Sequence, residues 1–315
     1  MNMDNALEAT NLTKYYRDFL AVDHINFQVK KGEIFGFLGP NGAGKTTTIR
    51  MLTGMSIPTE GTATIMGYNI QSQSVSAKEQ MGIVPDVSNT YNELSAWDNL
   101  TFTGRLYDLP KTYRENRAEE LLKMFGLYER RKDKVEDFSR GMKRRICIAM
   151  ALMNKGSILF LDEPTSGLDV QSVIIIRDLI RELNHKGLTV FITTHNIEEA
   201  SQMCNNVAII NHGEIVAIDT PEKLKRTLRG LQSVEVAFER APSNPSKELA
   251  ELPKVSQVIK EGDKFRLITE DSSTVLSSIY NYAQENNLKL ITINTLGPSL
   301  EDVFVKLTGI KPVTA

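Results

Sequence analysis

The fold of this chain is decided by residues 34–46, which read IFGFLGPNGAGKT. The apolar run 34–38 predicts a short buried strand, the glycines predict a loop, and the segment TTTIRMLTG that begins at Thr46 predicts a helix. Residues 39–46 match the pattern GxxxxGK[ST] in the context that binds phosphate, between a strand and a helix start. The backbone N–H groups of such a loop and the positive end of the helix dipole attract phosphate oxygens. We therefore expect a phosphate site in which Lys45 reaches the outer phosphates and Thr46 offers its hydroxyl to Mg²⁺.

A second apolar strand ends in two carboxylates, because residues 158–163 read ILFLDE and Pro164 follows. This order places one acid near a metal ion and the next on the γ-phosphate side of a nucleotide. We expect Asp162 to hold Mg²⁺ and Glu163 to polarise the attacking water. The alternative is a strand that is followed by an ordinary acidic turn.

A third apolar strand, predicted over 189–194, is followed directly by His195. A polar residue at the carboxyl end of a parallel strand faces the ligand edge of a doubly wound sheet. His195 is therefore a candidate site residue. The other histidines, His24, His185 and His212, lie in loop or turn contexts, where structural roles are expected.

The pattern of elements predicts two domains. Over 1–228 buried strands alternate with helices, which is typical of a mainly parallel sheet with helices on both faces. Apolar residues at helical spacing between Asn92 and Phe125 predict a helical insert, within a helical subdomain over about 87–155. The pattern changes near Arg229, and residues 232–310 predict a small α+β domain. Its order, β-α-β-β-α-β with a trailing helix, is ferredoxin-like.

The trailing helix, expected over 299–308, starts with Ser299 as its N-cap and Asp302 at the capping-box position. It presents one apolar stripe, made of Leu300, Val303, Phe304 and Leu307. The domain carries no phosphate loop and no catalytic constellation, so we expect it to act through contacts.

Composition excludes several classes of protein. The 315 residues carry 37 basic and 39 acidic side chains, so the net charge of −2 gives no basic field for nucleic acid, and we expect no nucleic-acid partner. The two cysteines form no CxxC pair, which indicates a reducing, cytoplasmic compartment. Apolar runs fall far short of the ~20 residues that span a bilayer. We expect any membrane contact to go through another protein.

The motifs occur in the order found in one family. They are the phosphate loop 39–46, the segment FSRGMKRR at 138–145, LFLDEP at 159–164, SGLD at 166–169, and Thr194-His195. Over about residues 7–225 the chain resembles the nucleotide-binding subunits of ATP-binding-cassette (ABC) transporters. The SxGMKxR segment and the C-terminal PSLEDVFVKLTG at 298–309 resemble the drug-resistance and sodium-export branch, which has a C-terminal extension.

The resemblance implies an α/β fold, the P-loop NTPase cassette, with a mainly parallel core, an antiparallel β part and a helical subdomain. It implies an ATPase that binds ATP and Mg²⁺, with Glu163 and His195 as catalytic residues. Tyr16 would stack on adenine with Val22 beside it. The implied phosphate contacts are Asn41, Gly42, Ala43, Gly44, Lys45, Thr46 and Thr47, and the implied metal residues are Thr46, Asp86 and Asp162.

The resemblance also implies partners. Ser139, Gly141, Met142 and Asp169 would complete the site of a second copy, in a homodimer that sandwiches ATP head to tail. A separate integral membrane permease would convert the motion into export, and the chain would lie on the cytoplasmic face of the membrane through that permease. The helical insert is the expected dock, with Trp97 either an apolar anchor or a core residue.

Three positions depart from the commonest family pattern. Asp86 stands where glutamine is usual, and Arg140 and Met142 stand where glycine and glutamine are usual. A carboxylate can ligate Mg²⁺, but it adds negative charge and cannot donate hydrogen bonds. Two alternatives therefore stay open at the level of sequence: a soluble ABC-type ATPase that acts on the ribosome or DNA, and a nucleotide-gated regulator with weak hydrolysis.

Overall fold

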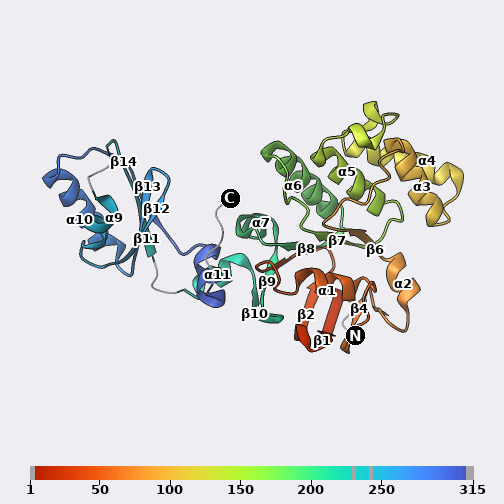
Figure 1. Cartoon of the computed structure of the whole chain (residues 1–315), viewed down its shortest axis with the longest axis horizontal. Helices are drawn as coiled ribbons and strands as arrows, with labels where there is room; N and C mark the ends of the chain where they lie inside the picture. The colour runs from red at the N-terminus through yellow and green to blue at the C-terminus, as the bar shows by residue number, and fades with distance from the viewer. Residues whose placement is uncertain (1–3, 229–231, 241–243, 310–315) are drawn as a thin grey trace. The chain divides into compact units, whose positions relative to one another are not determined.

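A computed structural model describes residues 4–228, 232–240 and 244–309. The chain divides into two compact units, residues 1–221 and 222–315 (Figure 1). The division falls earlier than the boundary at 228–232 that the sequence indicates, because nearly all of helix α8 (Pro221–Arg226) belongs to the second unit. The change of pattern near Arg229 lies outside the described residues.

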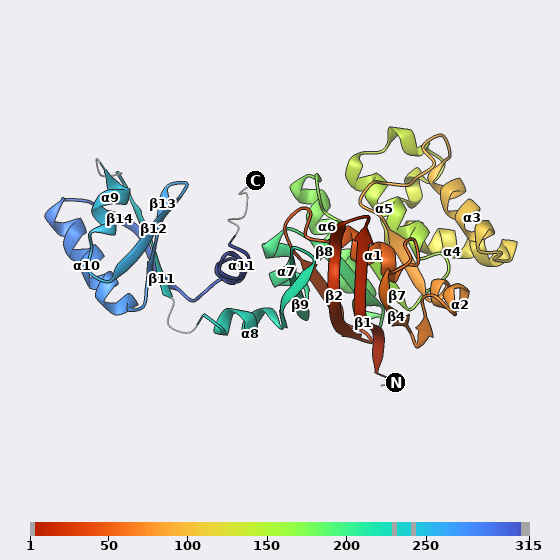
Figure 2. The ribbon, with the colours of Figure 1, turned by 60° about the horizontal axis from the view of Figure 1, so that its bottom comes forward.

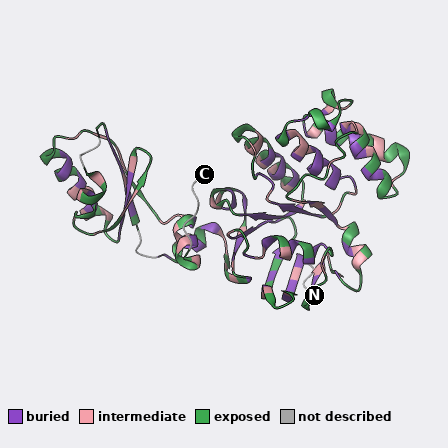
Figure 3. Cartoon of the chain, in the orientation of Figure 1, coloured by how far each residue is buried: buried purple, intermediate pink, exposed green. Residues whose placement is uncertain are grey.

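The first unit is built on a six-stranded sheet in the order β10-β9-β3-β8-β7-β6. The neighbouring strands are parallel except β10, which is antiparallel to β9. Their side chains are mainly buried (Figure 3). The strands are β3 (Ile34–Leu38), β6 (Met81–Val84), β7 (Ile158–Asp162), β8 (Thr189–Thr194), β9 (Asn206–Asn211) and β10 (Glu214–Asp219).

The register of this sheet brings the predicted motifs to one edge. Leu38 at the end of β3 pairs with Thr194 at the end of β8, and Asp162 at the end of β7 pairs with Thr193. On the other side of β7, Val84 pairs with Leu161. The segments that leave these strands therefore start from neighbouring points, as expected for the ligand edge of a parallel sheet.

A second, antiparallel sheet has the order β2-β1-β4-β5. It consists of β1 (Asn5–Tyr16), β2 (Phe19–Lys30), β4 (Glu60–Ile65) and β5 (Tyr68–Asn69). Helix α1 (Lys45–Leu52) contacts strands of both sheets and lies between them (Figure 1). A cluster of phenylalanine rings with centroids 5.5–6.0 Å apart fills the core, and burial of each ring contributes roughly 1.5–3 kcal/mol. The rings are Phe27, Phe35, Phe37, Phe160 and Phe191.

The remaining helices of the first unit are mostly gathered on the face of the six-stranded sheet away from α1 (Figures 1 and 2). They are α2 (Ser74–Glu79), α3 (Ala96–Leu106), α4 (Lys111–Met124), α5 (Arg140–Ala151), α6 (Val170–His185) and α7 (Ile197–Met203). Helices α3, α4 and α5 contact one another, and all three lie within residues 87–155. Within the described part of the chain, no helix combines the length and apolarity needed to cross a bilayer.

The second unit contains the predicted ferredoxin-like order of elements. Its antiparallel sheet, β12-β13-β11-β14, packs against α9 and α10 around an apolar core. The elements are β11 (Gln232–Phe238), α9 (Pro245–Ala250), β12 (Val255–Glu261), β13 (Lys264–Thr269), α10 (Ser272–Glu285), β14 (Leu290–Leu296) and α11 (Leu300–Thr308).

The predicted capping box of α11 is present, since Ser299 and Asp302 exchange side-chain and backbone hydrogen bonds. The apolar stripe is shorter than predicted, because Leu307 is 40% exposed whereas the stripe's other three residues are buried. Asp302 also pairs with Arg266 of β13 at 2.8 Å. The start of α11 is therefore tied to the sheet of its own unit.

Candidate nucleotide site

The Gly-rich loop leaves β3 and ends at α1, where its backbone curls around the Lys45 side chain. Lys45 Nζ donates to the carbonyl oxygens of Gly39 and Pro40 at 2.7 and 3.1 Å, and the side chain is buried. Gly44 has φ of 107°, and a Cβ there would lie 2.7 Å from the Ala21 carbonyl oxygen. Only glycine fits this position, because an L side chain would be strained and would clash with backbone.

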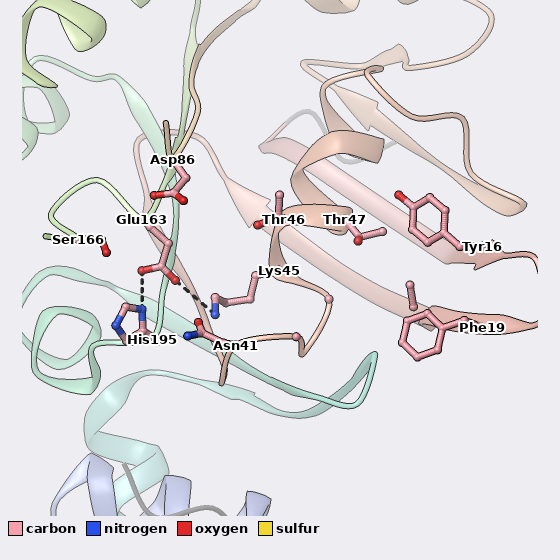
Figure 4. A pocket seen from close by; sticks show the side chains of 13 residues that line it. Tyr16, Phe19, Asn41, Lys45, Thr46, Thr47, Asp86, Glu163, Ser166 and His195 are labelled. Carbon is pink, nitrogen blue, oxygen red and sulfur yellow. Dashed lines mark hydrogen bonds and ion pairs between the residues drawn. The ribbon is translucent and has the colours of Figure 1, made fainter. Parts of the chain in front are cut away.

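Glu163 is the centre of a trio of ionisable side chains at the carboxyl edge of the sheet (Figure 4). Its Oε1 lies 3.3 Å from Lys45 Nζ, and its Oε2 lies 2.8 Å from His195 Nδ1. The Glu163 side chain is 13% exposed, whereas that of His195 is half exposed. The three side chains come from α1, from the loop after β7 and from the loop after β8, so the trio depends on the parallel register described above.

The backbone of Glu163 is strained in the left-handed region, with φ of 47°. A non-glycine residue in that region costs roughly 1–3 kcal/mol, which the surroundings must offset. The Glu163 N–H donates to the carbonyl oxygen and to the Oγ1 of Thr193, at 3.1 and 3.2 Å. These bonds attach the strained residue to the end of β8.

A cleft of about 490 Å³ surrounds the trio, a size typical of small-ligand sites. Most of the residues predicted to act on the nucleotide bound by their own chain line this cleft. They are Tyr16, Asn41, Gly42, Gly44, Lys45, Thr46, Thr47, Asp86, Glu163 and His195. Val22 and Ala43 are buried and do not line it. Asp162 is also buried outside the lining, and its Oδ1 accepts a 2.5 Å hydrogen bond from Thr193 Oγ1.

Three further residues line the cleft: Ser166, the first residue of the SGLD motif, and Phe19 and Ala21, which no sequence motif indicated. Phe19 pairs with Tyr16 across the β1–β2 hairpin and is 65% exposed. Figure 4 shows both rings together at the end of the cleft away from Glu163. The sequence signal that could have revealed Phe19 is an aromatic residue directly after the turn at Arg17 and Asp18.

The four residues predicted to act on a second copy lie outside this cleft. Ser139 is the exposed N-cap of α5, where its Oγ accepts from the Met142 N–H at 3.3 Å. Asp169 caps α6 and accepts two bonds from Ser172, which lower the pKa of its carboxyl. Gly141 lies against Ser172, because a Cβ at Gly141 would come within 2.0 Å of the Ser172 hydroxyl. The starts of α5 and α6 are thus packed together.

The donor chemistry of the cleft fits Mg²⁺, a hard cation that prefers oxygen ligands. Thr46 contributes a hydroxyl and Asp86 an exposed carboxylate, and both line the cleft. Among the described residues, no three His, Cys, Asp or Glu side chains gather into a metal cage. Mg²⁺ usually keeps several waters and is bound through one or two side chains together with substrate phosphates, and the Thr46 hydroxyl and the Asp86 carboxylate fit that role.

Comparison with protein families gives two matches. A model described as ABC transporter matches residues 22–166. A model described as the C-terminal domain of DrrA1-3-like ATP-binding proteins matches residues 220–308.

Curated relatives align over nearly the whole chain. The linearmycin resistance ATP-binding protein LnrL of Bacillus subtilis is 39% identical over 305 residues, which are 96% of this chain and 98% of that protein. The Nod factor export ATP-binding protein I of Cupriavidus metallidurans is 34% identical over 307 residues, 98% of each chain.

Solved structures resemble about two thirds of the chain. One is cbiO1 of Clostridium perfringens, part of an ABC transporter complex, with a TM-score of 0.65 and 28% identity over 70% of this chain and 90% of that one. Another is a dimeric ATP-binding cassette in a post-hydrolysis state with ADP and Pi, with a TM-score of 0.62 and 27% identity over 68% of this chain and 98% of that one.

Proposed function

Since this chain belongs to the ATP-binding proteins of ABC transporters, in the drug-resistance branch with a C-terminal extension, we propose that it hydrolyses ATP to power an exporter through a separate membrane permease. The observation that carries the hydrolytic role is the position of Glu163, held between Lys45 and His195 where a nucleotide's outer phosphates would lie. The relatives named above act in resistance or export, which favours an exporter over the soluble alternatives.

The proposal assigns each part of the chain a role. Residues 1–228 form the nucleotide-binding domain, with the helical subdomain over about 87–155, and residues 232–310 form an accessory domain. The chain would work in the cytoplasm, attached to the membrane through its permease. The balanced net charge of −2 supports the absence of a nucleic-acid partner from this proposal.

When ATP binds, the hydrogen-bond donors of the Gly-rich loop would leave their present partners within the chain and bind phosphate oxygens. Lys45 now donates to two loop carbonyls and pairs with Glu163, and the outer phosphates would offer it stronger, fully charged acceptors. The N–H groups of residues 41–47 lie at the start of α1, where the helix dipole favours anions. At the other end of the cleft, Tyr16 would stack on adenine, and the exposed ring of Phe19 extends the same apolar surface.

Hydrolysis would be carried out mainly by positioning and charge. Glu163 would accept a hydrogen bond from the attacking water and direct it in line with the γ-phosphate. His195, now bonded to Glu163 through Nδ1, would turn its second nitrogen to a γ-phosphate oxygen. Thr46 and Asp86, which line the cleft, would hold Mg²⁺ together with Asp162, which lies outside the lining and would act through water. The ion would supply positive charge that offsets the negative charge of the phosphates.

We propose that the site is completed by a second copy. Four residues at the starts of α5 and α6 lie outside the cleft of their own chain: the exposed Ser139 and Asp169, the partly buried Met142 and the buried Gly141. A head-to-tail homodimer would bring them to the γ-phosphate held by the partner copy. The likeness to a dimeric cassette with ADP and Pi supports this arrangement.

The helical insert supplies a surface for the permease. Trp97 on α3 is half-buried and lines a hollow of about 400 Å³. The other lining residues are Ser95, Asp98, Tyr128, Arg131 and Lys132. A half-buried indole that lines a hollow suits an anchor for a permease helix, because Trp and Tyr side chains contribute much of the binding energy at many interfaces.

The proposed function predicts that the purified chain releases phosphate from ATP in Mg²⁺ and that Lys45→Ala removes this activity. Loss of a buried cation that contacts the phosphates should weaken ATP affinity at least about tenfold, since a charge-assisted bond contributes roughly 1.5–3 kcal/mol. The measurement is phosphate release with ATP titration, and Lys186→Ala on the outside of α6 is the control. Equal activity of the Lys45→Ala and wild-type chains would refute the site.

Asp86→Gln is expected to shift the Mg²⁺ dependence of hydrolysis. Asp86 lines the cleft with a largely exposed carboxylate, and Gln would keep one oxygen ligand while removing a negative charge. The Mg²⁺ concentration for half-maximal rate should change by roughly threefold or more, the size of a weak charge interaction. An unchanged Mg²⁺ titration in a folded variant would show that Asp86 does not bind the metal.

A further inference from the structure

One buried arginine reaches from α5 to two sides of the nucleotide cleft. The side chain of Arg144 is only 4% exposed. Its Nη1 donates to the carbonyl oxygen of Pro85 at 2.6 Å, and its Nη2 donates to the carbonyl oxygen of Asp86 at 2.5 Å. Nη2 also lies 3.4 Å from the carbonyl oxygen of Glu163 and 4.0 Å from the Asp86 carboxylate. A single guanidinium thus joins three separate segments.

The charge of Arg144 is retained although its side chain is buried. Burial lowers the pKa of the guanidinium, while the negative charges of Asp86 and Asp162 act in the opposite direction. Arginine stays protonated in proteins, and a buried cation is tolerated only when it is hydrogen-bonded. The carbonyl oxygens of Pro85 and Asp86 supply those bonds. Because the guanidinium is a rigid planar fork, the two carbonyls are fixed relative to α5.

The contact with Glu163 falls on the strained residue. Glu163 has φ of 47°, and its N–H is held by Thr193 on the β8 side. Its carbonyl oxygen faces Arg144 on the other side. The peptide groups flanking this residue are therefore held from both sides, which is what a left-handed glutamate needs if it is to stay in one orientation.

We propose that Arg144 is a positioning residue that sets the placement of Asp86 and Glu163 and couples both to α5. The inference rests on the proposed function, in which Glu163 directs water and Asp86 binds the metal. Ser139, the N-cap of the same helix, would serve the partner copy's nucleotide. Each chain would contribute Glu163 to its own nucleotide site and Ser139 to the site of the partner copy. Helix α5 would connect these two sites.

The first test compares Arg144→Gln, Arg144→Lys and the control Arg117→Gln. Arg117 is also mostly buried and donates to one carbonyl at the end of α5, that of Leu152. Its partners Leu152 and Glu120 do not line the cleft, whereas Asp86 and Glu163 do. We expect Arg144→Gln to lower kcat at least about tenfold, with KM and the ATP dissociation constant in EDTA within about twofold. Arg144→Lys should recover part of kcat, since a lysine keeps the charge but cannot span the fork. Arg117→Gln should keep the wild-type kcat.

Wild-type kcat in a folded Arg144→Gln chain would overturn the proposal, as would an equal fall in kcat for Arg117→Gln. If the Gln variant does not fold, the Lys variant decides: a lowered kcat at normal ATP affinity supports the proposal, and a wild-type kcat overturns it. Failure of the proposed function would look different, because the wild-type chain itself would then lack ATPase activity.

The second test asks in which site Arg144 acts. In a mixed dimer of a Ser139→Arg chain and a Lys45→Ala chain, only the site with Lys45 of the first and Ser139 of the second is intact. We expect Arg144→Gln to lower the rate when it is placed in the Ser139→Arg chain, which supplies Glu163. Placed in the Lys45→Ala chain, it should have little effect. A loss confined to the second placement, or equal losses in both, would contradict the proposal.

Discussion

Glu163→Gln should abolish steady-state ATP hydrolysis while leaving ATP binding intact, with a rate at least about a hundredfold below wild type. The substitution keeps the size of the side chain but removes the carboxylate that would accept the proton of water. The substitution also removes the negative charge that lies 3.3 Å from Lys45 Nζ. Lys45 is then free to bind phosphate, so the affinity for ATP should not fall. Dimers held together by ATP should therefore accumulate, because the step that reopens them is blocked.

The measurement combines phosphate release with size-exclusion chromatography in ATP and Mg²⁺. Glu198→Gln, on the exposed side of α7, is a matched control that should behave as wild type. Full turnover by the Glu163→Gln chain would remove its assignment as the base. Loss of ATP affinity together with turnover would instead assign Glu163 a role in binding.

A mixture of two inactive variants should regain hydrolysis if Ser139 acts on the partner's nucleotide. Ser139→Arg places a bulky side chain at the exposed start of α5, and Lys45→Ala removes the phosphate contact of the loop. Each homodimer then has two defective sites. A mixed dimer has one intact site, so its rate should reach at most about half that of wild type.

The mixed dimers are isolated with two different affinity tags, so that their composition is known. Ser139→Ala is a milder companion, since it removes the N-cap bond at a cost of roughly 1 kcal/mol without adding bulk. Verified mixed dimers with no more activity than the two homodimers would count against a shared site.

Much of the site could be predicted because each motif is local. Glu163 and His195 each follow a buried strand directly, and Lys45 follows β3 after the loop 39–44. Parallel strands meet at one edge whatever the details of packing. Asp86 likewise lies just after a strand of this sheet, β6. The elements of the second unit could also be predicted, because apolar and polar residues alternate in its strands and its helices carry caps and apolar stripes. The exception is Leu307, which is exposed.

The parts that sequence reasoning missed depend on pairing between distant segments. Strand β1 has little alternation of its own and is defined by its partners β2 and β4. Thr193 holds both Asp162 and Glu163 from a neighbouring strand, and Arg144 reaches Pro85 from 59 residues away. Such contacts form only once the sheet is assembled, so they cannot be predicted from the spacing of residues in the sequence.

We propose above that this chain hydrolyses ATP to power export by a membrane permease. The most direct test isolates the tagged chain with its permease from detergent-solubilised membranes of its own host and measures phosphate release from Mg²⁺-ATP. The account predicts release that requires Mg²⁺ and disappears when the same complex carries Glu163→Gln. A complex that binds ATP without releasing phosphate, or that releases it equally with Glu163→Gln, would contradict the account.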